Sequence, residues 1–247
     1  MSSTPTTTTS TSSRPNKRGA LIVFEGLDRS GKSTQVSRLR QKLENQGHKV
    51  KQIGFPDRTS STGILINSYL TQRETKLSDE AIHLLFSANR WEKAEEIKRD
   101  LNQGTTIICD RYAFSGIAFS HIKGLSWDWC KSPDIGLPLP DLILFLSISS
   151  QTAQLRSGYG QERYETSEIQ NKVRKVFEKM ATQEFSSNKQ QGGGGRGRGK
   201  EEVWKEISAE GEVEQVEEKI WLQVEELWRD EDERLEKPVG KLWVDEN

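Results

Sequence analysis

The chain has 247 residues, a formal net charge of −1, 30% charged residues and 32% hydrophobic residues. Because the charges nearly balance, nothing attracts the chain as a whole to nucleic acid or to an anionic membrane, and we expect neither partner. The sequence holds no apolar run of membrane-spanning length. Cys109 and Cys130 suit neither a disulfide framework nor a metal site, which favours the reducing cytosol, with the nucleus as an alternative.

The first residues and the remainder of the chain differ in composition. Residues 1–18 are rich in Ser and Thr and show no apolar periodicity, so we expect a disordered tail. We expect residues 19–247 to form a single domain. Its first strand is predicted at residues 20–24, a short apolar run rich in branched side chains that is typical of a buried parallel strand.

A glycine-rich loop follows this strand. Residues 26–33 read G-L-D-R-S-G-K-S and fit the pattern G-x-x-x-x-G-K-[ST], with a helical pattern behind them. In such a loop, backbone N–H groups surround a phosphate, and the helix N-terminus adds partial positive charge. We therefore expect Lys32 to reach the outer phosphates of a nucleotide and Ser33 to ligate Mg²⁺. The predicted ATP phosphate-binding residues are Gly26, Ser30, Gly31, Lys32, Ser33 and Thr34.

Strand and helix patterns then alternate along the chain. Further strands are predicted at residues 49–55, 105–109, 141–147 and, more weakly, 203–207. This alternation predicts a three-layer α/β/α fold with a five-stranded parallel sheet. Ligands of such a sheet bind at the carboxyl ends of its strands, so polar residues that follow strands one, two and three should converge on one crevice.

Two later helices have apolar patterns. Ser78 is predicted to cap a helix that runs through Leu101, with a core stripe and with Phe86, Arg90 and Trp91 off that stripe. The predicted stripe consists of Ala81, Leu84, Leu85 and Ala88. The final amphipathic helix is defined by Val213, Val216, Ile220, Val224 and Leu227.

Two glycine-rich segments interrupt the second half of the chain. Residues 156–164 form a polar loop between helical segments, which is typical of a mobile lid. Residues 186–200 are of low complexity. We interpret them as a flexible surface insertion rather than an RGG-type nucleic-acid contact, since they contain two arginines and no interleaved aromatic residue.

Several charged residues suit phosphoryl transfer, which needs two phosphates held in line and their charge neutralised. Arg29 lies in the loop itself, and Arg58, Arg90 and Arg111 come from other segments. Asp110 follows the third strand, where a carboxylate can hold Mg²⁺ through water or accept a proton; the alternative is a strand-end cap or an ion pair with Arg111. We predict Arg29, Lys32 and Asp110 as catalytic residues. Asp28 is expected to face away from the phosphates, and Phe86 either stacks on a base or lies in the core.

The chain resembles the thymidylate kinases of the eukaryotic type, within the P-loop nucleoside monophosphate kinases, over about residues 18–243. The resemblance rests on several motifs in order: F-E-G-L-D-R-S-G-K-S-T at 24–34, F-P-D-R at 55–58, H-L-L-F-S-A-N-R-W-E at 83–92, D-R-Y-A-F-S-G-I-A-F at 110–119, W-C-K-S-P-D-I-G-L-P at 129–138 and E-R-Y-E at 162–165.

The resemblance implies transfer of the ATP γ-phosphate to dTMP, giving dTDP for dTTP biosynthesis, with Mg²⁺ as cofactor and a homodimer as the usual assembly. It implies that Arg29 assists transfer of the γ-phosphate and that Arg156 lies near adenine. The residues implied to bind dTMP are Asp28, Phe55, Arg58, Phe86, Arg90, Arg111, Ser115, Phe119 and Tyr164.

Other functions remain as alternatives. A GTP switch would need an N-K-x-D motif, and the sequence at Asn171 lacks the Asp. A catalytically dead nucleotide-binding protein would be expected to have lost Lys32, Arg29 or Asp110, and all three are present. Among enzymes, a kinase for another nucleoside monophosphate is the alternative, because only the base pocket separates it from a thymidylate kinase.

Overall fold

The computed structural model describes residues 17–72, 74–156, 163–185, 203–229 and 234–244. Residues 1–16 of the predicted tail (1–18), residues 157–162 of the predicted lid (156–164) and the predicted insertion at 186–200 therefore lie outside the described residues.

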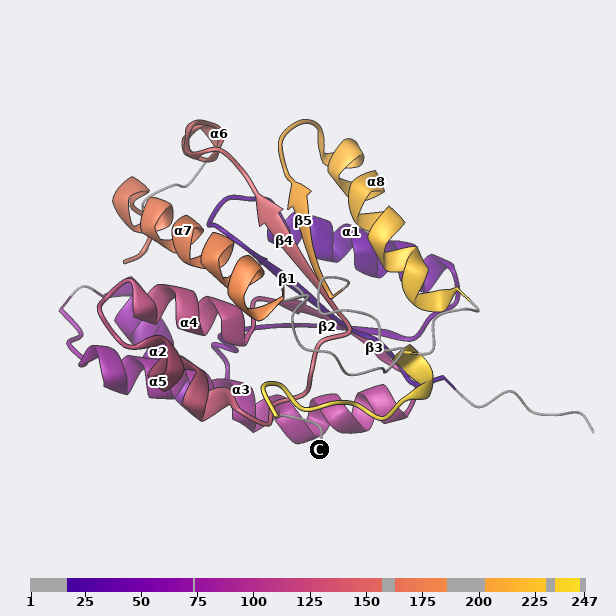
Figure 1. The fold of residues 1–247 in the computed structure, drawn as a ribbon, viewed down its shortest axis with the longest axis horizontal. Coiled ribbons are helices and arrows are strands. Elements are labelled where there is room, and N and C mark those ends of the chain that lie inside the picture. Colours follow the sequence, from indigo (N-terminus) through magenta and orange to yellow (C-terminus); the bar gives the residue numbers. More distant parts are fainter. Residues whose placement is uncertain (1–16, 73, 157–162, 186–202, 230–233, 245–247) are drawn as a thin grey trace, which may run out of the picture.

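A parallel sheet forms the centre of the molecule (Figure 1), and it confirms the predicted α/β class. Its order is β2-β3-β1-β4-β5, and every neighbouring pair is parallel. The observed strands lie within two residues of their predicted bounds: β1 (Leu21–Gly26), β2 (Val50–Gly54), β3 (Thr106–Asp110), β4 (Leu142–Ser147) and β5 (Trp204–Ser208).

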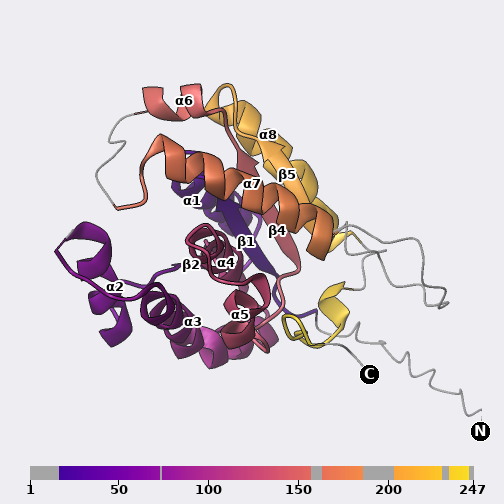
Figure 2. The same ribbon diagram turned by 60° about the vertical axis from the view of Figure 1, so that its left-hand side comes forward.

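Helices cover both faces of the sheet (Figures 1 and 2). Successive side chains of β1 point to opposite faces. Leu21 and Val23 join one core cluster with α3, α4 and α7, whereas Ile22 and Phe24 join another with α1 and α8. The helices are α1 (Lys32–Asn45), α2 (Ser61–Thr71), α3 (Asp79–Asn102), α4 (Ala113–His121), α5 (Trp127–Lys131), α6 (Ser150–Leu155), α7 (Ser167–Glu184) and α8 (Val213–Val224).

The predicted core stripe of α3 is wrong. Ser78 does cap the helix, since its hydroxyl accepts a hydrogen bond from the Ala81 N–H at 3.2 Å. However, Leu84 is 48% exposed, and Ala81, Leu85 and Ala88 are only half-buried. The buried side of the helix carries polar residues among its apolar ones, so hydropathy does not mark it. Its buried residues are Ile82, His83, Ser87, Asn89, Arg90, Ala94, Ile97 and Leu101.

The last predicted helix also differs in detail. Helix α8 ends at Val224, and Leu227 lies in the 3-10 turn Glu225–Trp228 that follows. Val213 is exposed rather than buried, whereas Val216 and Ile220 pack in the core as predicted.

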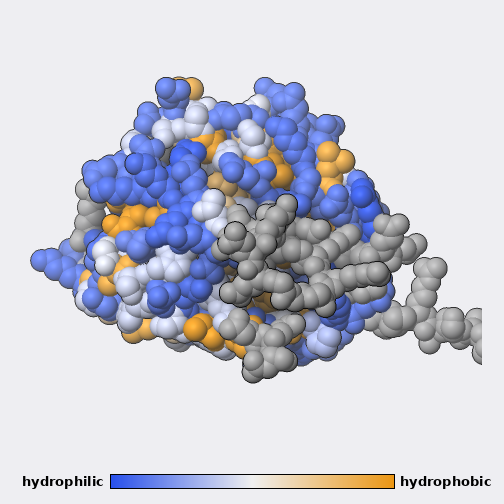
Figure 3. Space-filling view, viewed as in Figure 1, coloured by the Kyte–Doolittle hydropathy of each residue, from blue (hydrophilic) through white to orange (hydrophobic). Residues whose placement is uncertain are grey.

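Segments near the two ends of the described chain contact each other beside the start of β4. Arg18, at the end of the predicted tail, forms a two-pronged ion pair with Asp141 at 2.7 and 2.8 Å. Its backbone N–H also donates to the Leu235 carbonyl at 3.0 Å. The face seen in Figure 3 is mainly hydrophilic with small hydrophobic areas, in keeping with the high charged content. Among the described residues, no helix has both the length and the apolar character that crossing a bilayer requires.

Candidate active site

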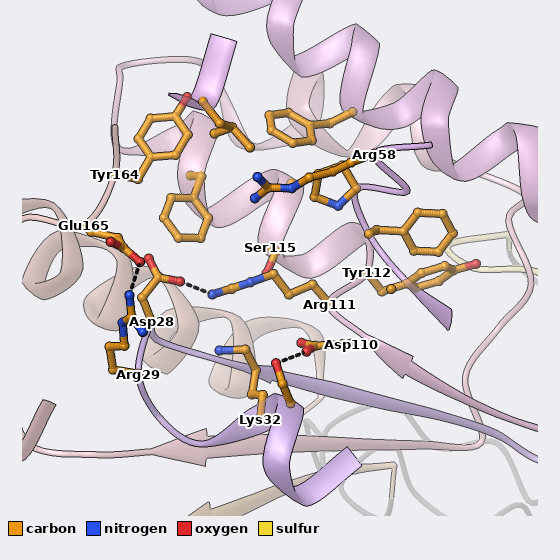
Figure 4. A pocket seen from close by; sticks show the side chains of 18 of the residues that line it. Asp28, Arg29, Lys32, Arg58, Asp110, Arg111, Tyr112, Ser115, Tyr164 and Glu165 are labelled. Carbon is orange, nitrogen blue, oxygen red and sulfur yellow. Dashed lines mark hydrogen bonds and ion pairs between the residues drawn. The ribbon is translucent and has the colours of Figure 1, made fainter. Parts of the chain in front are cut away.

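A cavity of about 670 Å³ lies at the carboxyl ends of β1, β2 and β3 (Figure 4). This is the crevice that the strand order of a parallel sheet predicts. Every predicted site residue lines it except Gly26 and Ser30, which form the framework of the loop. The lining residues are Asp28, Arg29, Gly31, Lys32, Ser33, Thr34, Gly54, Phe55, Pro56, Arg58, Leu70, Phe86, Arg90, Asp110, Arg111, Tyr112, Ser115, Gly116, Phe119, Arg156, Tyr164 and Glu165.

The loop between β1 and α1 has the geometry of a phosphate cradle. Gly31 lies at the N-cap of α1 with a φ of 89°, a conformation that favours glycine. A Cβ at Gly26 would lie 2.5 Å from the Leu146 carbonyl oxygen, so only glycine fits there. The buried Lys32 ammonium donates to the carbonyls of Gly26 and Leu27 at 3.2 and 2.6 Å. Burial, with a contribution from Arg111, lowers the pKa of Lys32 to about 8.

Ser33 and Asp110 lie together beside this loop. The Ser33 hydroxyl donates to Asp110 Oδ2 at 2.8 Å, across 77 residues of sequence. The predicted alternative for Asp110, an ion pair with Arg111 alone, therefore does not describe its contacts. A hydroxyl and a carboxylate are oxygen ligands that suit Mg²⁺. The described residues contain no cluster of three or more His, Cys, Asp and Glu side chains that could hold a metal ion.

Arg111 and Asp28 form an ion pair in the cavity wall (Figure 4). Arg111 Nη2 donates to Asp28 Oδ1, while Nη1 donates to the Gly26 carbonyl at 2.9 Å and to Ser115 Oγ at 3.0 Å. Arg111 has a φ of 68°, in the left-handed region that non-glycine residues seldom adopt. The Asp28 carboxylate pairs with this arginine, and its expected orientation away from bound phosphates stays a prediction.

Arg29 connects the loop to the segment after the lid. It also has a left-handed backbone, with a φ of 64°, and its guanidinium lies 3.4 Å from the Glu165 carboxylate. Arg156 Nη1 donates to the Arg29 carbonyl at 2.7 Å, and its Nη2 donates to the Ala209 carbonyl at 3.1 Å. Arg156 therefore links the loop to the end of β5, which is an edge strand of the sheet.

Aromatic side chains line the part of the cavity away from the loop. Phe86 is half-buried. It packs against the cluster of Ile66, Tyr69, Leu70 and Ile82 and also lines the cavity, so its stacking on a base stays a prediction. The Phe119 ring lies between Arg111, whose Cζ is 5.5 Å from its centroid, and Tyr164, whose ring is 5.3 Å away. Arg58 is exposed, donates to Asn67 Oδ1 at 2.9 Å, and extends into the cavity (Figure 4).

Arg90 is held by a partner that the sequence did not reveal. Its Nε and Nη2 donate to the two carboxylate oxygens of Asp134 at 3.0 and 2.6 Å, and both side chains are buried. Ser87 Oγ donates to the same carboxylate at 2.7 Å. The close approach of Gly116 fixes the guanidinium further, because a Cβ there would lie 2.8 Å from Arg90 Nη2.

Three further residues support the site and were missed by sequence reasoning. Glu25 is fully buried behind Arg111, and burial raises its pKa while Arg111 opposes that rise. Gln170 accepts from the Asp28 N–H at 3.0 Å and donates to the Asp28 carboxylate at 2.6 Å. Glu165 pairs with Arg29. An acid directly after an apolar strand was the available signal for Glu25, whereas Gln170 carried no signal in the spacing.

Comparison with known proteins places this site in a family. A family model described as thymidylate kinase matches residues 24–192. The chain belongs to the thymidylate kinase family. The thymidylate kinase of Schizosaccharomyces pombe is 56% identical over 163 residues, covering 66% of this chain and 77% of that protein. The human thymidylate kinase is 42% identical over 228 residues, covering 92% of this chain and 98% of that protein.

A solved structure agrees with the sequence comparison. The thymidylate kinase of Candida albicans superposes with a TM-score of 0.72 at 41% identity, covering 85% of this chain and 92% of that chain. This confirms the predicted fold and the resemblance. The chain is a thymidylate kinase in function, an enzyme that phosphorylates dTMP to dTDP with ATP as co-substrate.

Proposed function

We propose that the chain transfers the ATP γ-phosphate to dTMP within this one cavity, with Arg29, Lys32 and Asp110 as its catalytic residues. The observation that supports this proposal best is the convergence of cationic side chains from separate segments on a single cavity of about 670 Å³. Phosphoryl transfer depends on positioning and charge neutralisation rather than covalent chemistry by the protein. Lys32 neutralises charge on the outer phosphates, and Arg29 stabilises the charge on the transferred group.

The ATP end of the cavity is assigned to the loop. Its backbone and the side chains of Ser33 and Thr34 hold the phosphates, and Arg156 lies on the adenine side, where it already bridges the loop and the end of β5. Ser33 and Asp110 would hold Mg²⁺, the latter through water. When bound, the ion would neutralise phosphate charge and help to orient the reacting groups.

The dTMP end is assigned to the far wall. Arg58 and Arg111 bind the acceptor phosphate, since a guanidinium can donate two parallel hydrogen bonds to it. Phe86 stacks on the thymine ring, Arg90 meets its edge, and Phe119 lies under the sugar. The remaining members of this set are Asp28, at the 3′-hydroxyl, with Phe55, Ser115 and Tyr164 completing the wall.

The assembly is proposed to be a homodimer. Leu84 and Trp91 on α3, with Ile64 and Leu65 on the neighbouring α2, are exposed apolar side chains. A second copy would bury them, because neighbouring exposed apolar residues commonly mark an interface. Sedimentation of the Leu84→Glu variant should show monomers, whereas Leu222→Glu on α8, where the leucine is 56% exposed against 48% for Leu84, should sediment as the parent. A parent chain that sediments as a monomer contradicts the proposal.

The compartment is proposed to be reducing, the cytosol or the nucleus. Cys109 and Cys130 support this, because both are free and buried, without a disulfide between them. Localisation of the tagged full chain in its own cells would test the assignment.

The experiment that tests the proposed site is a coupled ADP-release assay with Mg-ATP and separate acceptors: dTMP, dUMP, UMP, dGMP and AMP. We expect the highest kcat/KM with dTMP. Arg58→Ala should raise KM for dTMP more than KM for ATP, whereas Thr34→Ala should do the reverse. Equal effects on both substrates would contradict the division of the cavity into two ends.

A further inference from the structure

Glu25 is a carboxylate enclosed in the core behind the cavity wall. It has no exposed surface, and it continues the face of β1 that Leu21 and Val23 direct toward α4. It is not among the cavity-lining residues. A buried carboxylate is costly unless its oxygens are satisfied by donors, so its partners show what it is held there to do.

Glu25 caps helix α4 from another element. The helix begins after Tyr112, which offers no side-chain cap. Glu25 Oε1 accepts from the Tyr112 N–H at 2.9 Å and from the Ser115 N–H at 3.0 Å. These are the N-cap and N3 amides, the same two donors that the two side chains of a capping box satisfy. The partial positive charge of the helix N-terminus further favours an anion at this point.

We propose that Glu25 is a positioning residue for dTMP binding, which fixes the backbone and the guanidinium of Arg111 in the orientation that grips the acceptor phosphate. The proposal rests on the proposed assignment of Arg111 to that phosphate.

The backbone of Arg111 is held on both sides. Its own N–H donates to the Phe24 carbonyl at 2.9 Å, and the next N–H, that of Tyr112, donates to Glu25. These two bonds bracket the left-handed φ of 68°. A strained backbone persists only where its surroundings determine it, and β1 supplies both of the bonds that do so here.

The guanidinium is oriented through Ser115. The Ser115 hydroxyl donates to Glu25 Oε2 at 2.5 Å and accepts from Arg111 Nη1 at 3.0 Å. A carboxylate can only accept, so the hydroxyl proton must point at Glu25 and a lone pair must face Arg111. Glu25 thereby sets the direction of the hydrogen-bond chain that ends at the arginine.

The substitution Glu25→Gln separates this positioning role from capping. The amide oxygen can keep both bonds to the helix N-terminus, while the amide NH₂ takes the place of Oε2 and donates to Ser115 Oγ. The Ser115 hydroxyl proton must then point elsewhere, and Ser115 Oγ accepts from the amide as well as from Arg111. We expect the melting temperature to change little, the Kd for dTMP to rise about tenfold, and the Kd for a non-hydrolysable ATP analogue to stay within about twofold, as loss of one charge-assisted contact predicts.

A second variant keeps the test independent of how Glu25→Gln folds. Ser115→Ala removes the relay and its bond to Glu25 Oε2 but leaves the two bonds from Glu25 Oε1 to the helix N-terminus, and it should weaken dTMP binding several-fold with ATP-analogue binding retained. In that background Glu25→Gln should have a much smaller effect on the Kd for dTMP than in the parent, because the relay is already lost. Isothermal titration of the full chain with each ligand gives all of these values.

Three outcomes would overturn the proposal, and they are distinguishable. If Arg111→Ala weakens dTMP binding but Glu25→Gln, while folded, does not, Glu25 has no positioning role. The same follows if Glu25→Gln weakens both ligands equally. If Arg111→Ala itself leaves the Kd for dTMP unchanged, the assignment of Arg111 to the acceptor phosphate fails, and the role of Glu25 falls with it.

Discussion

Removal of Asp134 should destabilise the fold through the arginine that it leaves behind. Arg90 is 2% exposed and Asp134 is fully buried, and the two make a bidentate pair with bonds of 3.0 and 2.6 Å. Breaking a buried ion pair by removing one partner costs about 3–5 kcal/mol, because an uncompensated charge remains in the core. A domain of this size loses roughly 2–4 °C of melting temperature per kcal/mol, so we expect Asp134→Ala to melt roughly 6–20 °C lower.

Differential scanning calorimetry of a small set of variants tests this reasoning. Ser87→Ala is the matched control, since it removes one neutral hydrogen bond to the same carboxylate and should cost only about 1 kcal/mol. The double variant Arg90→Met with Asp134→Ala should be more stable than Asp134→Ala alone, because it also removes the unpaired charge. A double variant no more stable than the single one, or an Asp134→Ala variant that melts with the parent, would refute the argument.

Three further predictions concern the catalytic loop and the insertion. Arg29→Ala should lower kcat by orders of magnitude in the coupled assay while the melting temperature stays close to that of the parent; unchanged turnover removes Arg29 from the mechanism. Burial lowers the pKa of Lys32 to about 8, and phosphate binds the protonated form better. ATP affinity should therefore be retained below that pH and fall above it, by up to about tenfold per pH unit. Titration with an ATP analogue from about pH 7 to about pH 9 checks this, and the affinity of Lys32→Arg should not change with pH over that range. Deleting residues 186–200 should leave kcat/KM nearly intact, because the rings of Phe185 and Trp204 on either side already stack at 5.1 Å; a large loss would mean that the insertion contributes to the site.

The sequence was sufficient to predict the sheet and the convergence of the site. Cavity-lining residues directly follow the first and third predicted strands. Parallel pairing of these strands is therefore enough to bring Asp110, Arg111 and the loop to one edge of the sheet. The phosphate loop is a continuous segment whose geometry is encoded by its own glycines. These features depend on local pattern and on one topological rule, which is why they could be read without coordinates.

The supports of the site could not be read in the same way. Arg90 is separated from Asp134 by 44 residues, and Glu25 from Ser115 by 90 residues. No spacing rule connects such residues, because their contact depends on how two helices and a strand pack. The prediction of the core stripe on α3 was wrong for a related reason. Hydropathy identified apolar positions such as Leu84, but the inner side of the helix is filled by polar residues with dedicated partners, leaving that leucine on the outside.

Arg29 and Arg111 also share an uncommon backbone conformation. Arg29, Arg111 and Trp243 are the non-glycine residues with positive φ in the described part of the chain, and two of them line the cavity. A side chain in this conformation costs about 1–2 kcal/mol that glycine would avoid. Each arginine directly precedes or lies within the turn that leads from a strand into a helix, where the chain must turn sharply to expose helix N–H groups. Both arginines line the cavity from these turns, and we propose that they meet bound phosphate there.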